Sequence, residues 1–100
     1  MGRIVKIASI QEVPPNGAIA VEHENEYIAV FNVDGTLYAI SDVCPHAGGP
    51  LSQGEVENGK VYCPWHGRSF HLNSALGDGD GVYRYKVIVE GDDISVEIPD

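Results

Sequence analysis

Short stretches in which apolar and polar residues alternate recur along most of the chain, and they predict β-strands. Before residue 42 the pattern predicts four strands, at 3–8, 18–23, 26–33 and 36–41. Farther along, it predicts strands at 55–57, 60–62, 69–72, 82–90 and 94–98. No stretch has the 3.6-residue apolar period of an amphipathic helix, apart from a short turn expected at 49–53.

Dipeptides that favour tight turns separate several of these strands, notably Asp34-Gly35 and Asn58-Gly59. Both residues of such a pair tolerate positive φ angles, so each pair predicts a hairpin. The alternation within 82–90 assigns four side chains to one face of a single strand, namely Tyr83, Tyr85, Val87 and Val89. Many short strands joined by Gly- and Pro-rich turns predict an all-β sandwich or barrel. The 100 residues suffice for one domain, at 1–100, with a modest core.

The chain is strongly acidic, with 15 Asp and Glu against 6 Lys and Arg and a formal net charge of −9. Such a charge repels nucleic acid and anionic membranes, and it either attracts basic protein partners or simply keeps a small protein in solution. No apolar run approaches the ~18 residues that span a bilayer, and the start MGRIVKIASI lacks the apolar core of a secretory signal. We therefore expect a soluble, cytoplasmic protein that binds neither nucleic acid nor membrane.

Residues 44–70 hold the most distinctive pattern, CPHAGGPLSQGEVENGKVYCPWHGRSF. One residue separates Cys44 from His46, and two separate Cys63 from His66. Each half has a Cys followed directly by Pro, then a His, then Gly. Thiolates and imidazoles are the ligands of zinc sites and of some iron–sulfur clusters. The two halves therefore predict paired metal-binding loops that contribute these four ligands.

Other interpretations of these residues stay open at this point. The two cysteines could form a disulfide, although each has a His at ligand spacing and no export signal is evident. A Cys2His2 zinc site is the main structural alternative, although paired zinc ligands are usually separated by two to four residues. His71 is close enough to Cys63 to be considered, but we favour His66 as the ligand. His23 stands between two glutamates and is expected to be exposed.

The pattern of residues 42–72 closely resembles the signature of Rieske iron–sulfur proteins. The resemblance implies one 2Fe–2S cluster, with Cys44 and Cys63 as ligands of one iron and His46 and His66 as ligands of the other. It also implies a small Rieske-type β-sandwich or barrel in which residues 42–72 form an inserted cluster-binding subdomain. Rieske-type oxygenases need a further catalytic domain, for which this length leaves no room. We therefore expect an electron carrier rather than an enzyme.

Differences from the Rieske proteins of cytochrome bc complexes indicate a low reduction potential. Those proteins have an additional cysteine in each loop, joined as a disulfide, where this chain has Gly49 and Trp65. They also have serine and tyrosine hydroxyls that bond cluster sulfurs, where this chain has Arg68 and Phe70. Fewer such bonds stabilise the reduced form less, so we expect a potential near roughly −150 mV. Many relatives cover the cluster with a third loop that contains proline. The acidic loop 73–81 of this chain has no proline, so the resemblance does not assign it that covering role.

The resemblance implies a soluble Rieske-type ferredoxin that passes single electrons from a reductase to a terminal enzyme. By family analogy the acceptor is a ring-hydroxylating oxygenase. Pro50, Leu51 and Trp65 are expected to shield the cluster and to form an apolar rim where a partner docks. CPHAGGPLSQG also resembles the small Rieske-like subunit of assimilatory nitrite reductase, which is the second candidate. A zinc-stabilised interaction module is the third, from a different functional class.

Overall fold

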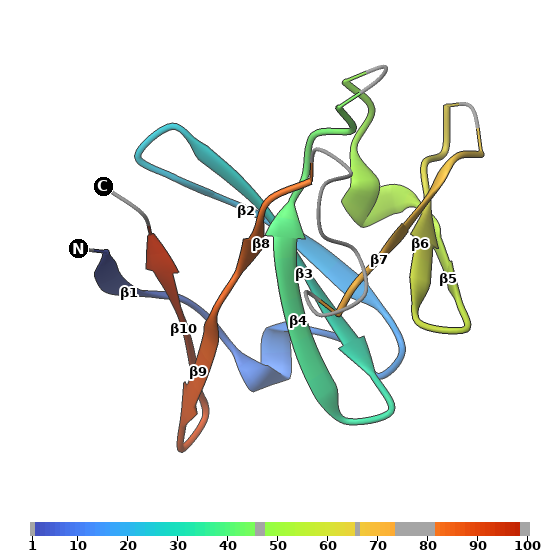
Figure 1. Cartoon of the computed structure of the whole chain (residues 1–100). Coiled ribbons are helices and arrows are strands. Elements are labelled where there is room, and N and C mark those ends of the chain that lie inside the picture. The colour runs from blue at the N-terminus through green and yellow to red at the C-terminus, as the bar shows by residue number, and fades with distance from the viewer. Residues whose placement is uncertain (1, 46–47, 66, 74–81, 99–100) are drawn as a thin grey trace.

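A computed structural model of the chain describes residues 2–45, 48–65, 67–73 and 82–98. This part contains three antiparallel sheets and two short 3-10 helices (Figure 1). The first sheet has the strand order β1 (Arg3–Ser9), β10 (Asp93–Ile98), β9 (Val87–Glu90). The second has the order β2 (Ala18–His23), β3 (Glu26–Val33), β4 (Thr36–Ser41), β8 (Arg84–Tyr85). The third has the order β5 (Glu55–Glu57), β6 (Lys60–Tyr62), β7 (Ser69–His71), and the all-β prediction is confirmed.

The two predicted hairpins form at the predicted dipeptides. Val33 pairs with Thr36 across Asp34 and Gly35, whose φ angles are 52° and 89°. In the third sheet, β5 and β6 are joined across Asn58 and Gly59, whose φ angles are 54° and 76°. Positive φ at both central residues matches the turn to the twist of the flanking strands. The turn chemistry of the sequence therefore fixes the register of both hairpins.

The prediction of a single strand over 82–90 is wrong. The chain forms β8 in the second sheet and β9 in the first, with Lys86 between them. Tyr85 pairs with Ala39 on β4, whereas Val87 pairs with Val96 on β10. The four residues assigned to one face consequently differ in burial: Tyr85 is buried, but Tyr83 and Val89 are exposed. Alternation is a local signal, so it continues unchanged where the chain crosses from one sheet to the next.

Both 3-10 helices lie in connections between strands. The short turn expected at 49–53 is present as η2 (Leu51–Gln53). The other helix, η1 (Ile10–Glu12), was not predicted. At its start, the backbone N–H of Ser9 donates to Glu12 Oε1 at 2.9 Å. A Ser followed three residues later by Glu is a known helix-start pattern. Among the described residues, no helix has the length and apolar character required to cross a membrane.

The second sheet lies between two apolar clusters, one on each of its faces. The first apolar cluster contains Ala29 and Phe31 of β3, together with both cysteines and residues of the third sheet. The second apolar cluster contains Ile28 and Val30 of β3, together with residues of the first sheet. Successive side chains of a strand point to opposite faces, so β3 is buried continuously from Ile28 to Phe31. This central strand anchors the cysteine-bearing half of the molecule.

Tyr85 provides a pH test of the second cluster. Its hydroxyl donates a 2.7 Å hydrogen bond to Glu26 Oε2, and burial, together with that bond, raises the pKa of Tyr85 well above its usual value. The folded protein thus holds the phenol proton more tightly than the unfolded chain, and this contribution to stability declines once the pH exceeds about 10. We expect Tyr85→Phe to lower the free energy of unfolding by about 1–3 kcal/mol near neutral pH. The deficit relative to wild type should shrink above about pH 10.

Urea unfolding of the wild type and Tyr85→Phe over a series of pH values measures this deficit. A deficit that stays constant into strongly alkaline solution would contradict the assignment.

Candidate metal centre

The first cysteine lies in a loop that two backbone hydrogen bonds close. The N–H of Cys44 donates to the carbonyl of Gly49 at 2.9 Å, and the N–H of Gly48 donates to the carbonyl of Cys44 at 2.8 Å. Gly48 has a φ of 74°, in the left-handed region that glycine adopts without a steric cost. The loop therefore turns back on itself and presents its cysteine at the base.

The second cysteine has the same backbone setting. The N–H of Cys63 donates to the carbonyl of Arg68 at 2.8 Å, and the N–H of Gly67 donates to the carbonyl of Cys63 at 2.9 Å. Gly67 has a φ of 78°. In both loops the cysteine bonds to the residues four and five positions later, and the fourth is a left-handed glycine. The duplicated pattern noted in the sequence is thus a duplicated backbone structure, and both loops project from the same end of the molecule (Figure 1).

Asp42 secures the base of the first loop, a role that the sequence did not predict. Its N–H donates to the carbonyl of Tyr27 on β3 at 2.8 Å, and its carbonyl accepts from the N–H of Leu51 at 2.9 Å. Its side-chain oxygen Oδ1 accepts from the N–H of Ser52 at 2.6 Å. Asp42 therefore ties both ends of the loop to each other and to the central strand.

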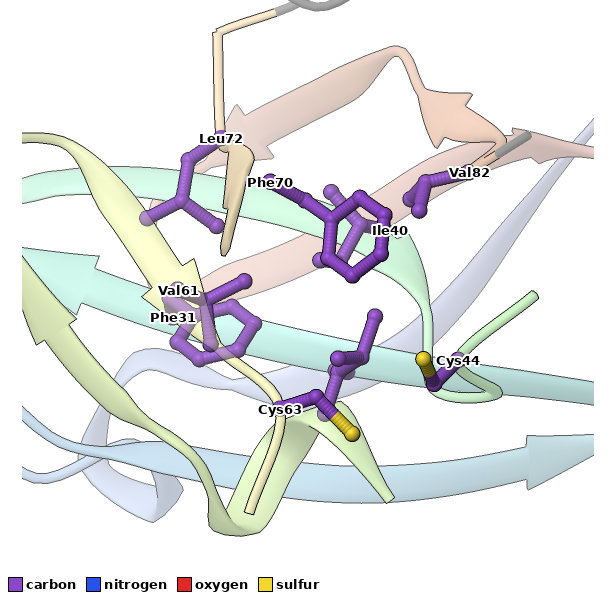
Figure 2. Packing of buried hydrophobic residues seen from close by; sticks show 10 residues of the cluster. Phe31, Ile40, Cys44, Val61, Cys63, Phe70, Leu72 and Val82 are labelled. Atoms are coloured by element: carbon purple, nitrogen blue, oxygen red, sulfur yellow. The ribbon is translucent and has the colours of Figure 1, made fainter. Parts of the chain in front are cut away.

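Both cysteine side chains belong to the first apolar cluster, with exposed fractions of 1% for Cys44 and 2% for Cys63. Figure 2 shows them on the same border of that cluster, below Phe70 and Ile40. Neither cysteine forms a disulfide, so the disulfide interpretation is wrong. Once deprotonated, two thiols enclosed by apolar side chains would give a metal an anionic ligand pair from which water is largely excluded.

The residues expected to shield the site occupy different depths. Leu51 is fully buried and Pro50 is half-buried, whereas Trp65 is 63% exposed. At this exposure, Trp65 does not pack in the core. Leu51 is too deep to contribute to a docking rim, which corrects that part of the prediction. Phe70 is buried in the first apolar cluster, below the loops.

Two of the four predicted ligands, His46 and His66, lie outside the described residues, as do residues 74–81 of the acidic loop. The part of the chain that is described has no group of three or more His, Cys, Asp and Glu side chains placed to hold a metal ion. The alternative ligand His71 is half-buried on β7, and its carbonyl accepts from Arg84 Nε at 2.8 Å. His23, expected to be exposed, has a side chain that is 31% exposed, with Nε2 3.8 Å from Glu24 Oε2.

The chain matches the protein family described as Rieske [2Fe-2S] domain over residues 3–86. It belongs to the Rieske family. The chain is 36% identical over 96 residues to the 3-phenylpropionate/cinnamic acid dioxygenase ferredoxin subunit of Escherichia coli (strain K12), with 91% of this chain and 90% of that protein covered. The same identity and coverage hold for the subunit of that name from Shigella boydii serotype 4 (strain Sb227).

Solved structures of ferredoxins share the fold of this Rieske protein. The Sphingomonas yanoikuyae B1 ferredoxin superposes with a TM-score of 0.84 at 24% identity, over 97% of this chain and all 100% of that one. The ferredoxin of carbazole 1,9a-dioxygenase from Nocardioides aromaticivorans IC177 gives 0.83 at 24% identity, over 97% and 98%. Family membership confirms the predicted 2Fe–2S cofactor, and the zinc interpretation is set aside. The buried thiols and the paired loops suit such a cluster, because one iron of a Rieske centre is bound by two thiolates.

Proposed function

We propose that this Rieske protein is a ferredoxin that carries single electrons from a reductase to a ring-hydroxylating oxygenase. The observation that carries the proposal is the end-to-end match, at 36% identity, with relatives named as dioxygenase ferredoxin subunits. By contrast, the chain spans only 30% of the terminal oxygenase of carbazole 1,9a-dioxygenase from Nocardioides aromaticivorans IC177, at 25% identity. When bound, the cluster supplies one-electron chemistry, and the surrounding residues hold it and exclude water.

We propose Cys44 and Cys63 as the ligands of one iron and His46 and His66 as the ligands of the other. Two observations support the cysteines. They have the same backbone hydrogen bonds, and both are buried at one border of the first apolar cluster. The support for the histidines is their place within the same two loops, between Cys and the left-handed Gly. Two neutral imidazoles in place of two thiolates make the centre less negative, which favours its reduction.

The exposed apolar surface at this end of the molecule is proposed to be the docking rim. It consists of side chains that flank the two cysteines, namely Val43, Pro45, Pro64 and Trp65. An apolar contact placed at the loops brings an acceptor close to the cluster, and the net charge of −9 favours a partner with a basic surround. We also infer one domain at 1–100 with a cluster-binding part at 42–72. A cytoplasmic location is also part of this proposal.

We expect a reduction potential near the low end of the Rieske range, roughly −150 mV. Phe70 stands where a hydroxyl would bond a cluster sulfur in high-potential relatives, and its buried side chain has no donor to offer. Arg68 is exposed. A spectroscopic redox titration of the purified protein measures the potential. A midpoint above roughly +100 mV would contradict the proposal that few hydrogen bonds reach the sulfurs.

The small subunit of nitrite reductase is the competing function. A structure described as a putative nitrite reductase (NADPH) small subunit superposes with a TM-score of 0.77 at 24% identity, which is a likeness of fold alone. The test is a reconstituted assay with the reductase and the terminal oxygenase of an aromatic-acid dioxygenase. Substrate oxidation that requires this protein supports the ferredoxin. Stable co-purification with a large reductase subunit, without transfer to the oxygenase, favours the nitrite reductase subunit instead.

A further inference from the structure

The two cysteine loops touch at Gly49, which has no room for a side chain. A β-carbon at this position would lie 2.9 Å from Cδ2 and 3.0 Å from Cγ of Trp65, and 3.2 Å from Sγ of Cys63. All three atoms belong to the second loop. Any side chain at position 49 must therefore displace either the tryptophan ring or the cysteine sulfur.

The ring of Trp65 covers this point of contact. Gly49 is buried although it carries no side chain, whereas Trp65 is 63% exposed. The ring atoms nearest to Gly49, Cγ and Cδ2, are neighbours in the body of the indole rather than at its far edge. The indole therefore lies against the first loop with one part and turns the rest to solvent.

Both partners of this contact hold central places in their loops. Gly49 accepts the hydrogen bond from the N–H of Cys44 that closes the first loop. Trp65 stands two residues after Cys63 and directly before His66. The two cysteines are not joined by a disulfide, so apart from the proposed iron ligands the described loop residues are held to each other by non-covalent contacts such as this one.

We propose that Trp65 is a positioning residue that holds the two cysteine loops together by packing its ring on Gly49. The inference rests on the proposed ligand set and adds a residue outside that set. While the loops are held together, the two sulfurs keep the spacing that one iron requires. The ring also lies near the sulfur of Cys63, because its Cγ and Cδ2 atoms and Cys63 Sγ all lie within 3.2 Å of the position that a β-carbon on Gly49 would take.

Three variants of the full chain test the proposal by the rate of cluster loss. Each is purified with iron bound and mixed with an excess of iron chelator, and the decay of its visible absorption is followed. Trp65→Ala and Gly49→Ala should both lose iron about tenfold faster than the wild type or more. Trp65→Phe keeps an aromatic ring and should stay close to the wild type. Ile4→Ala is the matched control, because Ile4 is a large apolar residue of similar exposure, 54%, on the first sheet.

Two further readouts separate positioning from general destabilisation. Trp65 is the only tryptophan of the chain, so its fluorescence reports directly on the ring. Gly49→Ala should change that emission, since the added methyl group displaces the indole, whereas Ile4→Ala should not. The electron paramagnetic resonance spectrum of reduced Trp65→Ala, recorded before iron is lost, should match the wild type because the ligands are unchanged.

The outcomes distinguish this inference from the proposed function. A wild-type protein that binds no iron overturns the proposed function. If the wild type binds iron but Trp65→Ala and Gly49→Ala release it at the wild-type rate, the positioning role is overturned and the proposed function stands. Iron loss from Trp65→Phe as fast as from Trp65→Ala also overturns it, since packing by a ring is then not the cause. Should Trp65→Ala fail to fold, Gly49→Ala and Trp65→Phe decide alone.

Discussion

Replacing Cys44 or Cys63 with serine is expected to abolish iron binding and the visible absorption of the protein. A thiolate, not a neutral hydroxyl, is the ligand that iron–sulfur centres use, and each cysteine supplies one of the two proposed thiolates. Both side chains are almost fully buried, which limits the access of water as a substitute ligand. Iron analysis and the visible spectrum of the purified variants measure the loss.

The control for this experiment is His71→Ala. His71 is near Cys63 in sequence but lies on β7, and we expect this variant to keep its iron. Since a buried hydroxyl without a partner costs about 1–3 kcal/mol, circular dichroism of the iron-free variants must show that they are folded. Wild-type iron content in Cys63→Ser, or loss of iron in His71→Ala, would refute the proposed ligand set.

Gly54→Ala is expected to give the largest loss of stability among single methyl additions. Gly54 adopts φ −78° and ψ 165°, which any residue tolerates, so the cost is steric rather than conformational. A β-carbon there would overlap the carbonyl oxygen of Tyr62 and lie 3.1 Å from Cγ2 of Val61. The backbone of β6 cannot rotate away as a flexible side chain can. We therefore expect a loss of about 3 kcal/mol or more in the free energy of unfolding.

This substitution also tests the link between the third sheet and the cysteine. Tyr62 is the last residue of β6 and directly precedes Cys63, so its displacement should lower the iron content as well. Gly59→Ala, in the hairpin that follows, is the control: its φ is 76°, and beyond its two chain neighbours no described atom lies within 4 Å of the added carbon. It should cost only the left-handed strain of about 1–2 kcal/mol and keep its iron. Urea unfolding decides; equal stability of Gly54→Ala and the wild type would contradict the packing of η2 against β6.

Most of the fold follows from local signals in the sequence. The alternation of apolar and polar residues predicted the strands because most strands are half-buried, with one face toward the core. Asp34-Gly35 and Asn58-Gly59 predicted the hairpins because each turn needs two residues with positive φ angles. The division of 82–90 into β8 and β9 escaped prediction, since the partners of Tyr85 and Val87 belong to different sheets and no local pattern records that change.

The candidate site was predictable in its chemistry but not in its architecture. The two Cys-Pro segments identified the loops, and family membership confirms the cofactor. The different Cys-to-His spacings hid the fact that the loops have equal Cys-to-Gly spacings and the same hydrogen bonds. The hydrogen bond from Ser52 to Asp42 and the cover of Trp65 over Gly49 join residues 10 and 16 positions apart. Such contacts depend on the assembled fold, which explains why sequence reasoning missed them.

The central claim is that two thiolates bind one iron of the cluster and two imidazoles bind the other. Its most direct test is electron paramagnetic resonance of the dithionite-reduced protein, produced with ¹⁵N-labelled histidine and with unlabelled histidine. We predict one unpaired spin per cluster, coupled to two histidine nitrogens whose signals change with the label, and the loss of one coupling in a variant of His46 or His66. A spin without coupling to histidine nitrogen, or a reduced protein with no spin at all, would contradict this account.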